Sequence, residues 1–169
     1  MTCSPEISLS PLTPETLPLA KAWFRDEETR RWLGDASWPE RALRLAKDPP
    51  TENDVTGRFV WLAYHDGEPV GLVDVERYED GVAGLALVVG PVFRKRGFGK
   101  KILSAVASHP ELALTPILRA GIEPANQASV RCFEGAGFEP RSEEPDEEGF
   151  IYFTRRIRPS EPEKLREEE

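Results

Sequence analysis

The sequence predicts an α+β fold in which one mixed, twisted central sheet is flanked by helices. Segments of strand length, such as the apolar run 82–89, are joined by turn sequences such as Asp66-Gly67, which is typical of β-hairpins. Segments with apolar residues at helical spacing lie between these strands, so we expect helices to cover the sheet. A chain of 169 residues is long enough to bury the core of one such domain.

The first third of the chain predicts a strand followed by short helices. The first helix can start at Thr13 or Thr16, and Pro18 favours the later start because a proline inside a helix removes a hydrogen bond. A capping-box sequence, Ser37 to Glu40, then predicts the start of another helix. The expected elements are a strand at 7–10, the first helix, a helical turn over 27–33, and the capping-box helix, which stops at Asp48.

The middle of the chain predicts three strands joined by tight turns. Because side chains alternate along a strand, Leu72, Asp74 and Glu76 share one face of the second of these strands. The third strand is almost wholly apolar, which is typical of a strand buried on both faces. The expected elements are strands at 58–64, 70–78 and 82–89, with turns at 66–67 and 79–81.

The rest of the chain predicts two more helices around a strand, and a final hairpin. The expected elements are a helix that runs to about 108, a strand at 116–122, a helix that Asn126 caps and Gly137 closes, and a hairpin formed by 138–141 and 149–157. We therefore expect a single domain over residues 1–157. The remaining segment, 158–169, is charged and contains proline, so we expect it to be disordered.

A cluster of five cations lies where the helix after strand 82–89 begins. A helix N-terminus carries a partial positive charge, so cations there are unfavourable unless an anion binds. Gly97 and Gly99 have no Cβ, which lets backbone N–H groups approach phosphate oxygens. The alternative interpretation is a solvated basic turn. The pattern is neither a Walker P-loop nor a dinucleotide-binding G-x-G-x-x-G. The five cations are Arg94, Lys95, Arg96, Lys100 and Lys101.

Composition restricts the function and the partners. The net charge of −8 argues against nucleic-acid binding, and an acidic protein with one basic loop is better suited to a small anionic cofactor. No apolar run approaches the ~20 residues of a membrane span, and the first residues do not resemble a signal peptide. Cys3 and Cys132 form no metal or redox motif, so we expect a cytoplasmic protein without a metal. We expect a monomer or a homodimer.

Two motifs, in the same order along the chain, resemble those of the GNAT N-acetyltransferases. Arg94-x-x-Gly97-x-Gly99, which follows an apolar strand and opens a helix, is similar to the family's acyl-CoA pyrophosphate loop. The segment from Asn126 to Phe138 resembles a later helix that usually reads Asn-x-x-Ala/Ser…Tyr…Gly-Phe. The resemblance covers residues 7–157. It is closest to the branch that holds aminoglycoside 6′-N-acetyltransferases and ribosomal-protein N-terminal acetyltransferases.

The resemblance implies a mixed, strongly twisted sheet with splayed central strands, and acetyl-CoA as the co-substrate. It implies that the backbone of strand 82–89 pairs with the pantetheine arm, while an N–H group on it polarises the thioester oxygen. The basic loop would wrap the pyrophosphate, and Asn126 would either contact the pantetheine region or simply cap its helix. The implied cofactor-binding residues are Leu87, Val88, Val89, Arg94, Lys95, Arg96, Gly97, Phe98, Gly99, Lys100, Asn126, Ser129 and Phe133.

Phe133 departs from the family pattern, because many members carry a tyrosine there that is proposed to protonate the leaving thiolate. Three interpretations remain open. A thiol with a pKa near ~8.5 can leave largely as the thiolate without an acid. Another group can act as the acid, such as Tyr78, Cys132 or Tyr152. Alternatively, the protein is a catalytically silent acyl-CoA-binding module.

The acceptor amine has to lose a proton before it attacks, which requires a base. Asp74 and Glu76, about 7 Å apart on one strand face, are the candidate catalytic residues, although a solvated strand face is the simpler alternative. His65 and His109 are expected to have surface roles.

The expected reaction transfers an acetyl group from acetyl-CoA to a primary amine by direct attack in a ternary complex. The resemblance places the segment between the first helices at the acceptor, so Asp35 and Trp38 are the candidate substrate-binding residues. The acidic loop 143–148 favours a cationic acceptor, either a small molecule or a peptide amine, although it can also be a solvated turn. We expect no nucleic-acid or membrane partner.

Overall fold

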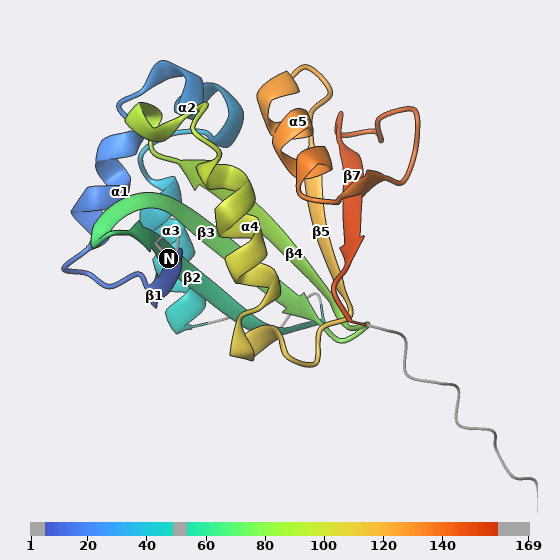
Figure 1. The fold of residues 1–169 in the computed structure, drawn as a ribbon, viewed down its shortest axis with the longest axis horizontal. Coiled ribbons are helices and arrows are strands. Elements are labelled where there is room, and N and C mark those ends of the chain that lie inside the picture. Colours follow the sequence, from blue (N-terminus) through green and yellow to red (C-terminus); the bar gives the residue numbers. More distant parts are fainter. Residues whose placement is uncertain (1–5, 49–53, 159–169) are drawn as a thin grey trace, which may run out of the picture.

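The computed structural model describes residues 6–48 and 54–158, which form a seven-stranded sheet with helices packed on it (Figure 1). The predicted mixed α+β fold is confirmed. The strands are β1 (Ser8–Pro11), β2 (Val55–His65), β3 (Glu68–Tyr78), β4 (Val82–Val89), β5 (Ile117–Ile122), β6 (Glu139–Pro140) and β7 (Ile151–Arg156). The α-helices are α1 (Leu17–Trp23), α2 (Glu27–Leu33), α3 (Trp38–Lys47), α4 (Phe98–Ala107) and α5 (Gln127–Gly135). The 3₁₀ helices are η1 (Pro91–Phe93) and η2 (Pro110–Leu112).

The strand order is β1-β2-β3-β4-β5-β7-β6, and the contact between β4 and β5 is the parallel one. This contact is short: it pairs Val82 with Ile117, Ala83 with Leu118 and Gly84 with Arg119, and then it ends. Beyond Gly84 the two strands separate, as Figure 1 shows toward the ends of the strands that lie near α4 and α5. Among the described residues, no strand pairs with this edge of β4 beyond Gly84, in the middle of the sheet.

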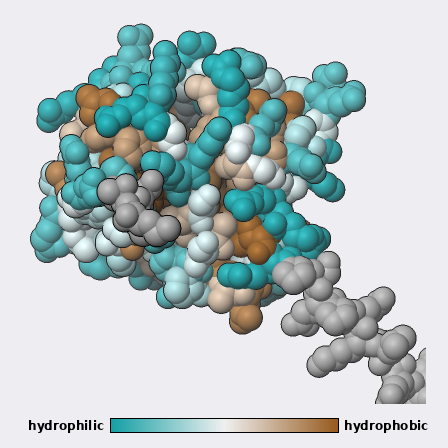
Figure 2. Space-filling model, in the orientation of Figure 1, coloured by the Kyte–Doolittle hydropathy of each residue, from teal (hydrophilic) through white to brown (hydrophobic). Residues whose placement is uncertain are grey.

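Two apolar cores lie on opposite faces of β2, β3 and β4. On one face, Val73 and Val75 pack with Ile102 and Val106 of α4, which crosses in front of the sheet in Figure 1. On the other face, side chains of α1 and α3 pack against alternate strand residues. Those side chains are Ala20, Phe24 and Ala42 on the helices, and Val60, Leu62, Leu72 and Val88 on the strands. Hydrophilic residues cover most of the face drawn in Figure 2.

Most predicted helix boundaries are confirmed, but the predicted capping box is wrong. The first helix starts at Leu17 with Pro18 in its first turn, as expected from the cost of an internal proline. Ser37 precedes α3, but its backbone is already helical, and its hydroxyl donates to Asp35 instead of accepting from the helix. A residue with helical dihedrals cannot direct its side chain back to the first-turn N–H groups. Pro39 in the first turn starts the helix without that cap.

Both strands of the C-terminal hairpin are shorter than predicted: β6 covers 139–140 of the expected 138–141, and β7 covers 151–156 of the expected 149–157. Its first strand, β6, has two residues, and one further backbone hydrogen bond, from the Arg141 N–H to the Tyr152 carbonyl at 2.8 Å, continues the pairing beyond Pro140. Strand β2 is longer than expected and continues to Val55. Of the segment expected to be disordered, residues 159–169 lie outside the described part of the chain.

Candidate active site

A cavity of about 500 Å³ opens where β4 and β5 separate, and we name it the inter-strand cavity. Its walls come mainly from five parts of the chain. They are residues 85–89 of β4, residues 93–100 before and within the first turn of α4 except Arg96, residues 120–123 at the end of β5, six of the residues 126–133 around α5, and four residues of α2. The short β4–β5 ladder therefore produces the cavity.

The N-terminus of α4 lies at this cavity without a side-chain cap from any described residue. The backbone turns into left-handed conformations at Lys95, with φ 61°, and at Gly97, with φ 80°, and the helix begins directly afterwards. The first N–H groups of a helix have no partner within the helix, so an anion can accept from them. By contrast, α5 is capped, because Asn126 Oδ1 accepts from the Ser129 N–H at 3.3 Å.

Not every predicted cation reaches the inter-strand cavity. Arg94, Lys95 and Lys100 line it. Arg96 and Lys101 instead lie over the ring of Phe98, with 5.3 Å and 5.6 Å from Arg96 Cζ and Lys101 Nζ to the ring centroid. The side chain of Arg96 is thus directed away from its predicted position beside a pyrophosphate. The other twelve residues predicted to bind the cofactor all line the cavity.

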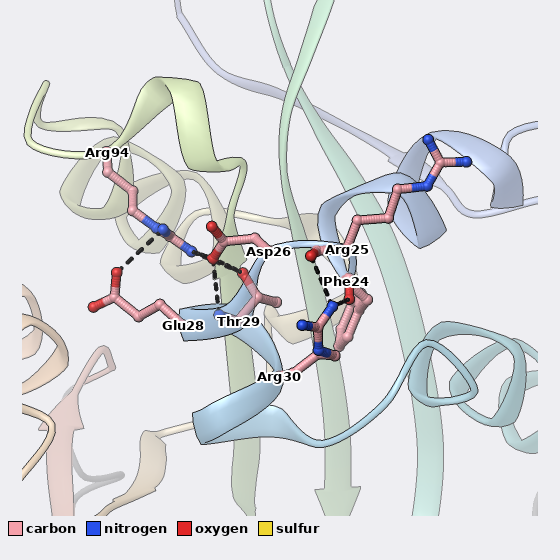
Figure 3. A network of polar contacts seen from close by, with 7 residues as sticks. All are labelled: Phe24, Arg25, Asp26, Glu28, Thr29, Arg30 and Arg94. Carbon is pink, nitrogen blue, oxygen red and sulfur yellow. Dashed lines mark hydrogen bonds and ion pairs between the residues drawn. The ribbon is translucent and has the colours of Figure 1, made fainter.

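Arg94 holds α2 against the cavity (Figure 3). Its Nη2 lies 2.6 Å from Asp26 Oδ2 and 2.7 Å from Thr29 Oγ1, and its Nη1 lies 3.2 Å from Glu28 Oε2. Asp26 also caps α2, since Oδ2 accepts from the Thr29 N–H at 2.9 Å. The hydrogen bond from Arg94, aided by that from the Thr29 N–H, lowers the pKa of Asp26 to about 2.

This network changes the role that we assign to Arg94. The sequence motif predicts a contact with phosphate, whereas the structure joins the guanidinium to three residues at the start of α2. Glu28, Thr29, Trp32 and Leu33 of this helix line the inter-strand cavity. Arg94 therefore connects the basic loop to a wall of the cavity.

Helices α4 and α5 approach closely beside the basic loop. A Cβ atom placed on Gly99 would lie 2.5 Å from Cys132 Sγ, so only glycine fits there without a shift of the neighbouring helix. Burial raises the pKa of the Cys132 thiol, with nearby Lys100 acting in the opposite sense. The thiol is therefore protonated at neutral pH. Phe133 is buried with its ring edge-on to Phe138.

A second cavity, of about 270 Å³, lies beside the first, and we name it the sheet-face cavity. It shares Leu85, Ala86 and Gly121 with the inter-strand cavity. Its other lining residues are Asp74, Glu76, Tyr78, Gly84, Arg119 and Tyr152. The two predicted catalytic carboxylates thus lie in a cavity that adjoins the predicted cofactor position.

Arg58 joins these two carboxylates. Its Nε and Nη2 lie 3.0 Å and 2.6 Å from the two oxygens of Asp74, and its Nη1 lies 3.2 Å from Glu76 Oε1. Desolvation in this buried position raises the pKa of Asp74, although the hydrogen bonds from Arg58 oppose the shift. Glu76 is the more accessible carboxylate, with 32% of its side chain exposed against 9% for Asp74. Glu76 also accepts a hydrogen bond from the Tyr78 hydroxyl at 3.2 Å.

The predicted acceptor wall is not brought to either cavity. Trp38 stacks on Phe24 in the α1–α3 core, with ring centroids 5.8 Å apart. Asp35 accepts hydrogen bonds from Ser37, which lower the pKa of Asp35. The acidic loop 143–148 is exposed and lines neither cavity. Trp32 and Leu33, one turn earlier in the chain, occupy the inter-strand wall instead.

Sequence reasoning missed Arg58 and Arg119. Each is an arginine within an apolar strand, and that signal alone marks a buried or site-lining charge. Within residues 6–48 and 54–158, no cluster of three or more His, Cys, Asp or Glu side chains could hold a metal ion. In the same part of the chain, no helix is long and apolar enough to cross a membrane.

Comparisons with known proteins agree with the fold and the motifs. Residues 6–139 match the family model described as acetyltransferase (GNAT) domain. The chain is 35% identical over 136 residues to the uncharacterized N-acetyltransferase YfmK of Bacillus subtilis (strain 168), which covers 80% of this chain and 86% of that protein.

Two solved structures show the same fold. An acetyltransferase from Thermus thermophilus has a TM-score of 0.72 at 21% identity, over 92% of this chain and 99% of that one. AAC(6')-Ib, solved with paromomycin and acetyl-CoA, has a TM-score of 0.70 at 18% identity, over 89% and 93% of the two chains. With its motifs, its fold and these relatives taken together, the chain belongs to the GNAT family and is an N-acetyltransferase.

Proposed function

We propose that this protein transfers an acetyl group from acetyl-CoA to a primary amine, by direct attack of the amine on the thioester within a ternary complex. The observation that carries the proposal is the uncapped N-terminus of α4. It lies beside Lys95 and Lys100 in a cavity of about 500 Å³ between separated strands. A diphosphate suits unpaired N–H groups and flanking cations, and AAC(6')-Ib, which shares the fold, was solved with acetyl-CoA.

In this proposal the basic loop binds the pyrophosphate through Lys95, Lys100 and the N–H groups after Gly97. The free edge of β4 at Leu87, Val88 and Val89 pairs with the pantetheine arm, because those backbone groups have no strand partner on the β5 side. An N–H group on that edge polarises the thioester carbonyl. Asn126, Ser129 and Phe133 form the opposite wall.

The acceptor amine enters through the sheet-face cavity. This cavity adjoins the inter-strand cavity at Leu85, Ala86 and Gly121, so the amine and the thioester can meet there. Two carboxylates, Asp74 and Glu76, share the guanidinium of Arg58, and the negative charge that remains on this side of the cavity attracts the cationic ammonium group of the acceptor. One of the carboxylates then removes a proton from the ammonium, directly or through water.

The leaving thiolate needs no tyrosine in this proposal. The thiolate of coenzyme A, whose thiol has a pKa near ~8.5, can depart without a proton and take one from water afterwards. If an acid contributes, Cys132 is available, since it lines the inter-strand cavity and burial keeps it protonated by raising its pKa. Tyr78 and Tyr152 lie instead in the sheet-face cavity, on the acceptor side.

The test is a thiol-release screen, in which acetyl-CoA is mixed with the protein and a panel of primary amines. Amine-dependent release of free coenzyme A, with one acetyl group added to the amine by mass spectrometry, is the expected result. If the protein binds coenzyme A but no amine in a broad panel stimulates release, the protein is a silent acyl-CoA-binding module and the proposal is wrong.

A further inference from the structure

Arg119 lies at the point where β4 and β5 separate. Arg119 and Gly84 form the last pair of the parallel ladder. The residues that follow them, Ala120 and Leu85, already line the inter-strand cavity. Arg119 itself lines the sheet-face cavity and not the inter-strand cavity. Its position therefore suits contact with the acceptor and not with coenzyme A.

The guanidinium of Arg119 is held between two aromatic rings. Its Cζ lies 5.6 Å from the ring centroid of Tyr78 and 5.5 Å from that of Tyr152. Gly121 leaves room for one of these rings, since a Cβ there would lie 3.2 Å from the Tyr152 ring. Aromatic faces orient a guanidinium while leaving its N–H donors free for a ligand.

The two arginines of this region differ in their partners. Arg58 pairs with both Asp74 and Glu76, whereas Arg119 forms no ion pair with any Asp or Glu of the described residues. The Tyr78 hydroxyl donates to Glu76, so the same tyrosine borders both the carboxylate pair and the free guanidinium. One net negative charge on the β3 side thus faces one positive charge on the β5 side.

This charge pattern is complementary to a molecule that carries an ammonium and a carboxylate. We propose that the acceptor is an amino acid, or another amine with a nearby carboxylate, and that Arg119 binds that carboxylate. Guanidinium groups bind carboxylates through two parallel hydrogen bonds, which fixes orientation as well as position. The amine then lies toward Glu76 and Asp74. This inference rests on the proposed function and adds the acceptor class to it.

The experiment compares matched acceptors by thiol release from acetyl-CoA: each common α-amino acid, its α-amide, and the amine that lacks the carboxylate. We expect the free acid to be preferred over its amide. Arg119→Gln should lower kcat/KM for the free acid by about 30-fold or more, chiefly through KM, and leave the amide unaffected. Arg119→Lys should restore part of the loss. Arg156→Gln, which changes an exposed arginine of β7 outside both cavities, is the control.

Failure of this inference can be told apart from failure of the proposed function. If acids and amides react equally well and Arg119→Gln is unchanged, the inference is wrong, while acetyl transfer stands. If no amine reacts although calorimetry detects coenzyme A binding, the proposed function is wrong. In that case, the Nε–H NMR signal of Arg119 is followed in coenzyme A-saturated protein as the α-amino acids are added. A signal that shifts supports the carboxylate site, and one that stays fixed with every amino acid overturns it.

Discussion

Asp74 and Glu76 lie two residues apart on one face of β3, but their surroundings differ. Both oxygens of Asp74 accept from Arg58, and its side chain is 9% exposed. Glu76 uses one oxygen for Arg58 and the other for Tyr78, and it is 32% exposed in the cavity where we place the acceptor. Asp74 is thus positioned to hold Arg58, whereas Glu76 is positioned to receive a proton.

We therefore expect the amide variants of these two residues to separate stability from activity. Asp74→Asn should lower the free energy of unfolding by about 1–3 kcal/mol, because one of the two Arg58 N–H groups that donate to Asp74 loses its acceptor in this buried position. Glu76→Gln should change stability by less than about 1 kcal/mol but lower kcat/KM by about 10²-fold or more, the usual effect of losing a general base. Urea unfolding and acetyl-transfer kinetics measure the two effects.

The opposite pattern would identify Asp74 as the base. Burial raises the pKa of Asp74, and a base whose pKa lies nearer to neutral pH removes a proton more readily. If Asp74→Asn removes the acidic limb of the pH–rate profile while Glu76→Gln retains it, our assignment is wrong.

At the residue scale, the sequence motifs bring the predicted cofactor-binding residues to one cavity but do not fix the directions of their side chains. Twelve of the thirteen predicted cofactor residues line the inter-strand cavity, because the motif sets the backbone path. Arg96 turns onto aromatic rings, and Arg94 turns to α2. Such long side chains contact distant segments. Arg94 pairs with Asp26, 68 residues earlier in the chain, and local sequence patterns do not predict such a pair.

Among the elements, α2 depends on a charged contact with the basic loop. Asp26→Asn keeps a capping side chain but removes the charge that pairs with Arg94, so we expect a loss of about 1 kcal/mol near neutral pH. The pKa of Asp26 is lowered to about 2 in the folded protein, from an ordinary value of 3.8. Its contribution is therefore complete above about pH 4 and disappears as the pH falls toward 2.

The measurement is urea unfolding of the native protein and Asp26→Asn between pH 7 and pH 3, with Arg94→Gln and the double variant alongside. The stability difference between native protein and Asp26→Asn should shrink as the pH falls below about 4. The double variant should lose less than the sum of the two single losses. Equal differences at both pH values, or strictly additive losses, would contradict the contact.

The packing of α4 on α5 depends on the absence of a side chain at Gly99. Gly99→Ala should destabilise the protein by about 1–3 kcal/mol, because its Cβ would lie 2.5 Å from Cys132 Sγ. Adding Cys132→Ala removes that sulfur and should restore part of the stability. Denaturant titration of the single and double variants measures the recovery.

Gly97→Ala is the matched control for this pair. A Cβ on Gly97 meets no atom within 4 Å, but its φ of 80° strains any other residue, at a cost of about 1–2 kcal/mol. That cost comes from the backbone, so Cys132→Ala should not relieve it. If Cys132→Ala restores stability to Gly97→Ala, or restores none to Gly99→Ala, the close approach of the helices is not the cause of the lost stability.

At the level of the whole molecule, the sequence predicts the sheet, the order of elements and the basic loop, because each depends on local patterns. The acceptor side is harder to predict. Trp38 joins a core with Phe24, and Trp32 lines the cavity instead, although both tryptophans belong to short helices. The sheet-face cavity brings together β3, β4, β5 and β7, so Arg119 and Tyr78 meet only after the chain folds.

The central claim is that the uncapped start of α4, with Lys95 and Lys100, binds the diphosphate of coenzyme A. The direct measurement is calorimetric titration of coenzyme A into the native protein, Lys95→Gln, Lys100→Gln and Lys101→Gln. We expect binding by the native protein that weakens with salt, about tenfold weaker binding for each of the first two variants, and no change for Lys101→Gln, whose side chain lies over Phe98. An absence of binding heat, or an equal loss for Lys101→Gln, would contradict the claim.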